Sequence, residues 1–209
     1  MSNYSRLRVP GGTYFFTVRL QDQQSDLLVS RIDVLRHATQ LCLNRWPFKI
    51  DAAVILPNKL HMIWTLPDGD ADYSKRWRMI KTTFSRHVPA PDYVPQSHRR
   101  RGEKGIWQRR FWEHLIRDDE GLALHMHLIR AAPIHAGLAK GPNTWPHSSF
   151  YKGMRCTSAA MLEPLPRLHH PQVQQLLRRP FESNRLRPMK AIDHIAAARI
   201  AAQCFCCSE

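Results

Sequence analysis

The chain has 209 residues, the length of one ordinary domain or of one domain with a tail. It carries 31 lysines and arginines against 17 aspartates and glutamates, which gives a formal net charge of +14 at pH 7. This surplus favours a polyanionic partner, first nucleic acid and second an anionic membrane surface, and argues against an enzyme of small neutral metabolites. Hydrophobic residues make up 43% of the chain, which argues against wholesale disorder.

No apolar run approaches the roughly 18 residues that a membrane-spanning helix needs. Residues 1–6 lack the apolar stretch of a secretory signal, so we expect a cytoplasmic location and no membrane partner. Three of the five cysteines lie in the last six residues. An odd number in this arrangement is not a disulfide framework, and it lacks the paired spacing of a zinc finger.

Secondary structure is predicted from hydrophobic periodicity and turn residues. Pro57-Asn58-Lys59 has the length of a hairpin turn, and Pro133 is expected to stop the last helix. In chain order we expect a strand over 13–20, a helix over 31–45, strands over 48–56 and 60–66, a helix over 73–87, a bent strand over 105–117 and a helix over 118–131. This order predicts an α+β fold, a ferredoxin-like antiparallel sheet with helices packed on one face.

The composition changes near residue 152. Residues 1–152 hold all of these elements and form the first predicted domain. Residues 153–209 form a basic, proline-rich tail that we expect to be largely irregular, because proline breaks helices and central strands. A short helix near 189–203 is expected within this tail, because that stretch is rich in alanine.

Several segments in consistent order carry a family resemblance. They are residues 9–18, 48–52, 56–57, 60–64 and 105–118, followed by Pro133, Gly137-Leu138 and 145–150. Over residues 3–152 the chain resembles the REP-associated tyrosine transposases, bacterial single-tyrosine relatives of the HUH transposases.

The resemblance implies a metal-dependent cleavage of single-stranded DNA. Family members hold a divalent ion through two histidines separated by one apolar residue on a strand, where alternation places both on one face. A glutamine or asparagine on a later helix completes the site. A tyrosine four residues before it attacks a phosphorus and forms a covalent phosphotyrosine link, while the metal polarises the phosphate.

This sequence departs from that pattern at three positions. Lys59 stands at the first histidine position, Leu128 at the tyrosine and Ala132 at the amide, while His61 is kept as a vestigial ligand. No catalytic residue is therefore expected to be intact, and no cofactor is expected unless activity remains, in which case it would be Mg²⁺ or Mn²⁺. An ammonium at position 59 would repel a metal, although it would attract a phosphate.

Two histidines, His125 and His127, lie on the helix predicted over 118–131 and are candidate replacements for the lost nucleophile. We interpret both as part of a solvated helix face. His127 is one residue from the tyrosine position, which turns it about 100° around the helix.

The basic clusters predict a DNA-binding surface, because arginine forms paired hydrogen bonds with phosphates and base edges, and tryptophan stacks on unpaired bases. The resemblance implies a DNA hairpin with adjacent single strand as the ligand. The expected contacts are Arg6, Arg8, Lys75, Arg76, Arg78, Lys81, Arg86, Arg99, Arg100, Arg101, Lys104, Trp107, Gln108, Arg109 and Arg110. Trp107 is open to a second interpretation, as a core residue. Neutralising about six phosphates predicts a slope of about −4 to −5 for log affinity on log salt.

The leading hypothesis is a DNA-binding family member that has lost strand cleavage, in effect a pseudoenzyme associated with the bacterial nucleoid. Three alternatives stay open. They are an active transposase or DNA nickase with an unforeseen nucleophile, a decaying gene product, and a basic RNA-binding protein of the ferredoxin-like class. The sequence carries no signal for the oligomeric state.

Overall fold

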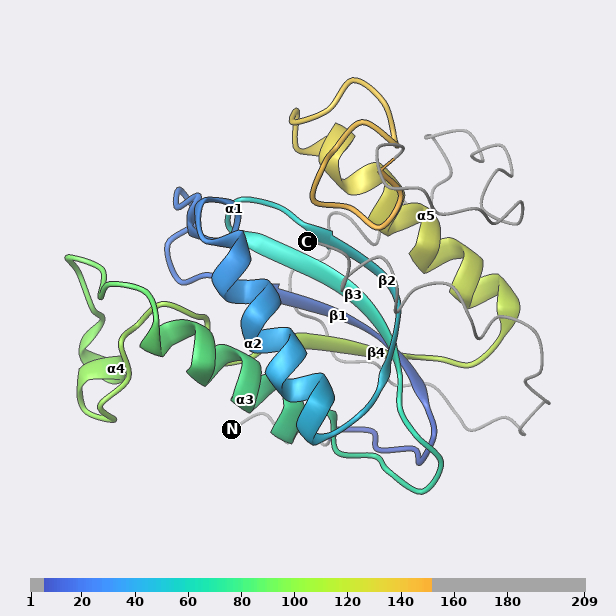
Figure 1. Ribbon diagram of the computed structural model, residues 1–209, viewed down its shortest axis with the longest axis horizontal. Coiled ribbons are helices and arrows are strands. Elements are labelled where there is room, and N and C mark those ends of the chain that lie inside the picture. The colour runs from blue at the N-terminus through green and yellow to red at the C-terminus, as the bar shows by residue number, and fades with distance from the viewer. Residues whose placement is uncertain (1–5, 152–209) are drawn as a thin grey trace.

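The computed structural model describes residues 6–151, so the predicted tail over 153–209 lies outside the described residues, with its helix near 189–203. The described chain forms a four-stranded sheet in the order β2-β3-β1-β4 (Figure 1). All neighbouring strands are antiparallel. The strands are β1 (Thr13–Arg19), β2 (Lys49–Ile55), β3 (Lys59–Thr65) and β4 (Trp112–Ile116). The antiparallel order confirms the predicted α+β, ferredoxin-like sheet.

The helices predicted from periodicity are all present. They are α2 (Ile32–Arg45), α3 (Tyr73–Arg86) and α5 (Asp119–His135), and two short helices, α1 (Leu27–Ser30) and α4 (Gln96–Arg99), were not predicted. One helical turn is too short to leave a periodic pattern in the sequence. No helix within residues 6–151 is long and apolar enough to cross a membrane.

Two cores cover the two faces of the sheet, because alternate strand residues point to opposite sides. On β1, Tyr14, Phe16 and Val18 pack in one core together with α2 and α3. Phe15 points the other way and packs in a second core with Ile129 of α5.

The predicted placement of the helices on one face is confirmed for α2 and α3 and is wrong for α5. Helix α5 contacts β2 and β3 from the opposite side, as Figure 1 shows. The apolar residues of the second face explain this position. Phe15, Val54 and Ile63 alternate with residues of the first core, and they need a cover of their own.

The prediction that the last helix stops before Pro133 is also wrong. Helix α5 continues to His135, and Pro133 lies buried within it. The stop signal is Gly137, whose φ of 69° lies in the left-handed region. Its amide donates to the Ile134 carbonyl at 2.9 Å, and the Leu138 amide donates to the Pro133 carbonyl at 2.9 Å. These two bonds form a Schellman motif, so a proline near the end costs the helix one hydrogen bond without breaking it.

The bent strand predicted over 105–117 is regular only over β4. Before β4, Trp107 forms an isolated bridge with Leu20, next to the end of β1. In the stretch between, the Gln108 amide donates to the Arg19 carbonyl of β1 at 3.0 Å. The Arg109 guanidinium that follows is paired with Glu103 at 3.1 Å. This segment borders the surface described next.

Candidate nucleic-acid interface

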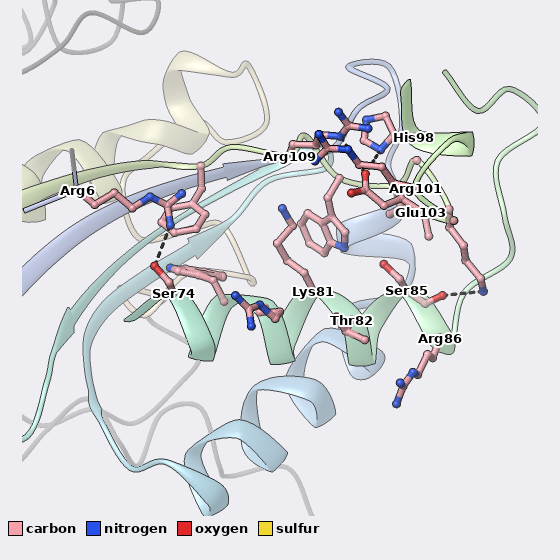
Figure 2. Close-up of a pocket in the computed structure, with 18 residues that line it drawn as sticks. Arg6, Ser74, Lys81, Thr82, Ser85, Arg86, His98, Arg101, Glu103 and Arg109 are labelled. Atoms are coloured by element: carbon pink, nitrogen blue, oxygen red, sulfur yellow. Dashed lines mark hydrogen bonds and ion pairs between the residues drawn. The ribbon is translucent and has the colours of Figure 1, made fainter. Parts of the chain in front are cut away.

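A cationic groove lies between α3 and the segment 98–111 (Figure 2). Its volume is about 650 Å³. Seven arginine and lysine side chains line it against one carboxylate, that of Glu103. Of the fifteen predicted DNA contacts, eight line this groove: Arg6, Arg78, Lys81, Arg86, Arg101, Lys104, Trp107 and Arg109. The structure therefore gathers residues that lie up to about one hundred positions apart in the sequence.

Helix α3 forms one wall of the groove because it is strongly amphipathic. Its apolar side chains, including Trp77, Ile80 and Phe84, are buried in the first core. At its start the side chain of Asp72 accepts a hydrogen bond from the Lys75 amide at 3.0 Å, which satisfies one of the free amides of the first turn. The basic residues then fall on the side that the core leaves exposed.

Glu103 organises the opposite wall. Its carboxylate lies 2.6 Å from Nδ1 of the buried His98 and 3.1 Å from Nε of Arg109. Burial alone would raise the pKa of Glu103, but the hydrogen bonds and charges of Arg109 and His98 outweigh it and hold the pKa below its usual value. The carboxylate is thus charged and holds the loop after α4 in place.

Two lysines in the groove donate to backbone carbonyls and form no ion pair with a residue in 6–151. Lys81 donates to the Gln108 carbonyl at 2.7 Å. Burial, together with the charge of Arg6, lowers the pKa of Lys81 to about 8 against the opposing effect of Glu103. Lys104 donates to the carbonyls of Ser85 and Val88. Both ammonium groups are fixed in position before any ligand arrives.

Arg6 closes one end of the groove and is already engaged. Its guanidinium donates to the Ser74 hydroxyl at 2.8 Å, lies 3.5 Å from the Glu113 carboxylate and stacks 4.2 Å above the Phe111 ring. Glu113 therefore compensates part of its charge.

Three exposed arginines of the groove have no such partners. Among the described residues, the side chains of Arg78, Arg86 and Arg101 form no ion pair and no hydrogen bond. In Figure 2 Lys81 points from α3 toward the opposite wall, whereas Arg86 points away from it. Arg86 therefore extends the positive surface beyond the groove.

The prediction that Arg76 contacts DNA is wrong. Its side chain is 1% exposed and pairs with Asp70 at 2.9 Å. It also donates to three backbone carbonyls, those of Trp46, Pro47 and Asp72. Arg76 joins α3 to the end of α2 and the chain before β2, and it has no freedom to reach a ligand.

Other predicted contacts differ in how far they remain accessible. Lys75 is half-buried and pairs with Asp70 at 3.2 Å. Trp107 is 6% exposed and packs on Phe84, with ring centroids 5.2 Å apart, which favours its interpretation as a core residue over an open base platform. The Gln108 carbonyl accepts a hydrogen bond from Lys81. Outside the groove, the remaining predicted contacts are all exposed: Arg8, Arg99, Arg100 and Arg110.

His61, the histidine of the family pattern that this sequence retains, lies on the face of the sheet that α5 covers. His61 is opposite Thr17 in the register of β3 and β1, and its Nδ1 is 2.8 Å from the Thr17 hydroxyl. Its ring stacks on Phe15 with centroids 5.6 Å apart. Burial, and then the charges of Lys59 and Arg19, lower the pKa of His61 to about 3. His61 is therefore neutral at physiological pH.

Helix α5 presents only apolar groups at the two positions that the resemblance singles out. Leu128 is 6% exposed and Ala132 is 4% exposed, and Ala132 belongs to the second core with Ile63 of β3. No tyrosine occurs on α5.

The interpretation of the two α5 histidines as a solvated face is wrong for His125. This residue is 2% exposed, packs against Phe15 with ring centroids 4.7 Å apart, stacks on His114 at 4.9 Å, and donates from Nδ1 to the Gly121 carbonyl. His127 is half-buried. Burial lowers the pKa of both imidazoles, with Arg130 adding to the effect on His127. The apolar second core, which sequence periodicity did not reveal, accounts for the burial of His125.

Comparison with known proteins places this geometry in a family. A REP-associated tyrosine transposase of Escherichia coli is 41% identical over 152 residues, which cover 73% of this chain and 84% of that protein. A Haemophilus influenzae relative of the same family description is 40% identical over 156 residues, 74% of this chain and 89% of its own length. The chain belongs to the REP-associated tyrosine transposase family.

A solved structure supports the same assignment. The REP-associated tyrosine transposase in that structure, which is bound to a REP hairpin, has a TM-score of 0.62 and 42% identity over 72% of this chain and 83% of its own. No protein-family model matches the chain.

Transposases of this type work with a divalent metal, and the residues at the corresponding site here do not fit one. The donor set is a single imidazole, that of His61, flanked by the cations Lys59 and Arg19. Within residues 6–151 no group of three or more histidine, cysteine, aspartate or glutamate side chains is placed to hold a metal ion. The positive charges of Lys59 and Arg19 beside His61 would repel a metal ion.

Sequence reasoning missed two groups that the structure brings to these sites. His98 and Glu103 fix the wall of the groove, and the spacing of five residues between them gave no helical or strand signal. The second missed group is Arg19, whose position could have been predicted from strand alternation. It lies two residues after Thr17 on a strand, so alternation places it on the face of Lys59 and His61.

Proposed function

We propose that this chain binds DNA through the cationic groove, with a hairpin and its adjacent single strand as the ligand. The observation that carries the proposal is the gathering of seven cations around one carboxylate in a single groove. Phosphate diesters are the polyanion that such a surface attracts. A related transposase structure is bound to a REP hairpin, which supports the choice of ligand. Bound in this way, the protein would be associated with the nucleoid of its bacterium.

We further propose that the chain does not cleave DNA through a phosphotyrosine. A phenol is needed on the helix that faces the kept histidine, and α5 offers buried Leu128 and Ala132 at the corresponding positions. His125 is no substitute nucleophile, because its ring is enclosed by Phe15 and His114.

Binding is tested with a fluorescent DNA hairpin carrying a single-stranded extension, titrated at several salt concentrations. Five groove cations lack a carboxylate partner: Arg78, Lys81, Arg86, Arg101 and Lys104. A contact from each predicts a slope of about −4 for log affinity on log salt. The double variant Arg78→Gln/Arg101→Gln should reduce this slope by about 1.5. The exposed Lys140→Gln outside the groove is the matched control and should leave the slope unchanged.

A flat salt dependence removes the proposal. Equal affinity for an RNA hairpin of the same sequence shifts it to the RNA-binding alternative. Cleavage is tested separately, by incubating the protein with the same DNA and Mg²⁺ or Mn²⁺ and separating the products on a denaturing gel. A covalent protein–DNA adduct would contradict the loss of cleavage and leave the DNA-binding proposal standing.

A further inference from the structure

Two buried donors in the cationic groove have no acceptor. Trp77 on α3 and Trp107 on the opposite wall both line the groove, and they are 1% and 6% exposed. The indole Nε1 of each is closed to solvent and has no hydrogen-bond partner within residues 6–151. The indole of Trp145, by contrast, donates to the Ile55 carbonyl at 2.8 Å. A buried indole N–H ordinarily finds an acceptor, so the two in the groove point to one that a ligand supplies.

Ring packing holds both donors in fixed positions. Trp77 stacks on Trp64 with ring centroids 4.2 Å apart, and Trp107 packs edge-on against Phe84 with centroids 5.2 Å apart. Both rings are too buried to be open stacking platforms. What they offer a ligand is therefore the N–H group at the edge of each ring, already oriented by the core.

The groove also supplies one aromatic face, which a cation covers in the free protein. Phe111 lines the groove, with its ring centroid 6.0 Å from that of Trp77. The guanidinium of Arg6 lies 4.2 Å above the Phe111 ring and donates to the hydroxyl of Ser74, one helical turn before Trp77 (Figure 2). Arg6 lies outside regular secondary structure. A movement of this one side chain uncovers the Phe111 ring next to Trp77.

The combination of an aromatic face with two N–H donors selects a nucleobase. A phosphate suits the cations of the groove, but burying it against an aromatic ring removes its hydration. A base has a face that stacks on an aromatic ring and edge atoms that accept hydrogen bonds. The volume of about 650 Å³ lies in the range of pockets for small ligands. Neighbouring bases cover both faces of a base within a duplex, so only an unpaired base can enter.

We infer that Trp77, Trp107 and Phe111 form a nucleobase subsite in the cationic groove, which takes one unpaired base of the bound DNA. The base replaces the Arg6 guanidinium on the Phe111 ring, and its edge atoms accept from the indole N–H groups. This inference rests on the proposed DNA-binding function. It adds a contact to a base, whereas contacts from cations to phosphates carry no sequence information.

The first test follows the indole N–H signals of the full chain, labelled with ¹⁵N at tryptophan, by NMR. The chain has six tryptophans, and Trp77→Phe and Trp107→Phe assign the two signals of interest by their loss. A DNA hairpin with a single-stranded extension should shift both signals downfield. The signal of Trp145, which already has an acceptor, should stay in place.

Abasic DNA identifies the group that causes these shifts. Each unpaired nucleotide of the hairpin is replaced in turn by an abasic site, which keeps the phosphate and removes the base. One replacement should abolish the shifts of both indole signals, and the others should leave them intact. Shifts that survive every replacement would overturn the assignment to a base.

Affinities give a second measurement. Trp107→Phe keeps an aromatic ring without the donor, so it should weaken binding of the intact DNA about fivefold. Toward the DNA with the abasic site at the identified position, the parent and Trp107→Phe should bind equally, because the contacted base is gone. Trp145→Phe, outside the groove, is the matched control and should leave both affinities unchanged. Equal affinity of Trp107→Phe and the parent for the intact DNA would contradict the inference.

The outcomes separate the base subsite from the proposed function. If the parent chain binds the hairpin with the expected salt slope and both indole signals stay in place, the subsite is overturned while the DNA-binding function stands. If the chain binds no DNA, free deoxynucleoside monophosphates titrated into the labelled chain test the subsite alone. Shifted indole signals would then retain a nucleotide site without the DNA-binding function, and unshifted signals would remove both.

Discussion

The guanidinium of Arg76 lies 2.9 Å from the carboxylate of Asp70 and is buried, whereas most arginines within residues 6–151 are exposed. Two positions further along α3, Arg78 is exposed and lines the cationic groove. The two residues are of one type on one helix, and the rotation of about 100° per residue gives them different roles.

Replacing Arg76 should therefore affect stability, whereas replacing Arg78 should affect DNA binding. Arg76→Met leaves the carboxylate of Asp70 with Lys75 as its remaining ion-pair partner and frees three carbonyls, so it should lower the free energy of unfolding by about 3 kcal/mol. Arg78→Met should change stability by less than about 0.5 kcal/mol and weaken DNA binding. Chemical denaturation and DNA titration of both variants measure the two effects. Equal stability of the two variants would contradict the structural role of Arg76.

Asp70 makes the same pair sensitive to acid. The hydrogen bond from Arg76 outweighs burial and, with the Asp72 amide and Lys75, holds the pKa of the carboxyl well below the ordinary value of 3.8. The pair contributes stability that is fully present above the ordinary pKa and is lost as the pH falls toward the folded-state pKa. Thermal unfolding should show a falling melting temperature below about pH 4, and Asp70→Asn should flatten this dependence while lowering stability at neutral pH. An acid profile unchanged by Asp70→Asn would show that other carboxyls dominate.

Lys81 should link DNA binding to pH. Its pKa of about 8 rises when a phosphate approaches, since an opposite charge favours the protonated form. Affinity should therefore fall between about pH 7 and pH 9 at constant ionic strength, with uptake of a proton on binding. Lys81→Arg should remove this dependence, because arginine stays charged. An identical pH profile for the two proteins would exclude Lys81 from the contact.

Protonation of Lys81 should affect the free energy of unfolding in the opposite direction to the DNA affinity. The folded-state pKa lies below the ordinary value of 10.5, so the charged lysine opposes folding. This penalty is complete below about pH 8 and disappears as the pH rises toward the unfolded-state value. Stability and DNA affinity are thus expected to change in opposite directions over this range.

Restoring the family groups tests the assignment of the lost positions. Lys59→His, Leu128→Tyr and Ala132→Asn together should give a metal-dependent covalent adduct with hairpin DNA on a denaturing gel. Leu128 is buried, so the larger ring should cost about 1–3 kcal/mol of stability. The matched control carries Leu128→Phe in place of Leu128→Tyr, which has the ring without the hydroxyl and should form no adduct. A triple variant that folds and binds DNA without forming an adduct would show that at least one position is misplaced.

The predicted boundary at residue 152 is open to a direct measurement. Both cores are built from residues that precede it, from Tyr14 to Phe150. A chain ending at Lys152 should therefore unfold in one cooperative transition within about 3 °C of the full chain. A much lower melting temperature would show that the tail packs on this domain.

The order of the main elements was accessible from the sequence because each carries a local signal. Runs of apolar, aromatic and β-branched residues marked β1, β2 and β3, and the spacing of Ile32, Leu35 and Ala38 marked α2. Two errors had a common cause in tertiary structure. Pro133 is tolerated because the helix ends soon after it at a left-handed glycine, and His125 is buried because α5 covers a second apolar face.

The sequence by itself determined the antiparallel α+β fold, the excess of positive charge and the absence of a tyrosine from α5, because these depend on composition and on local periodicity. Only the tertiary structure decided which cations share a surface. The helical rotation places Arg76 and Arg78 on different sides of α3, and the path of segment 98–111 brings its cations next to those of α3. The strand register places Arg19 opposite Lys59. Charge is a property of single residues, whereas a binding site depends on distances that the chain acquires when it folds.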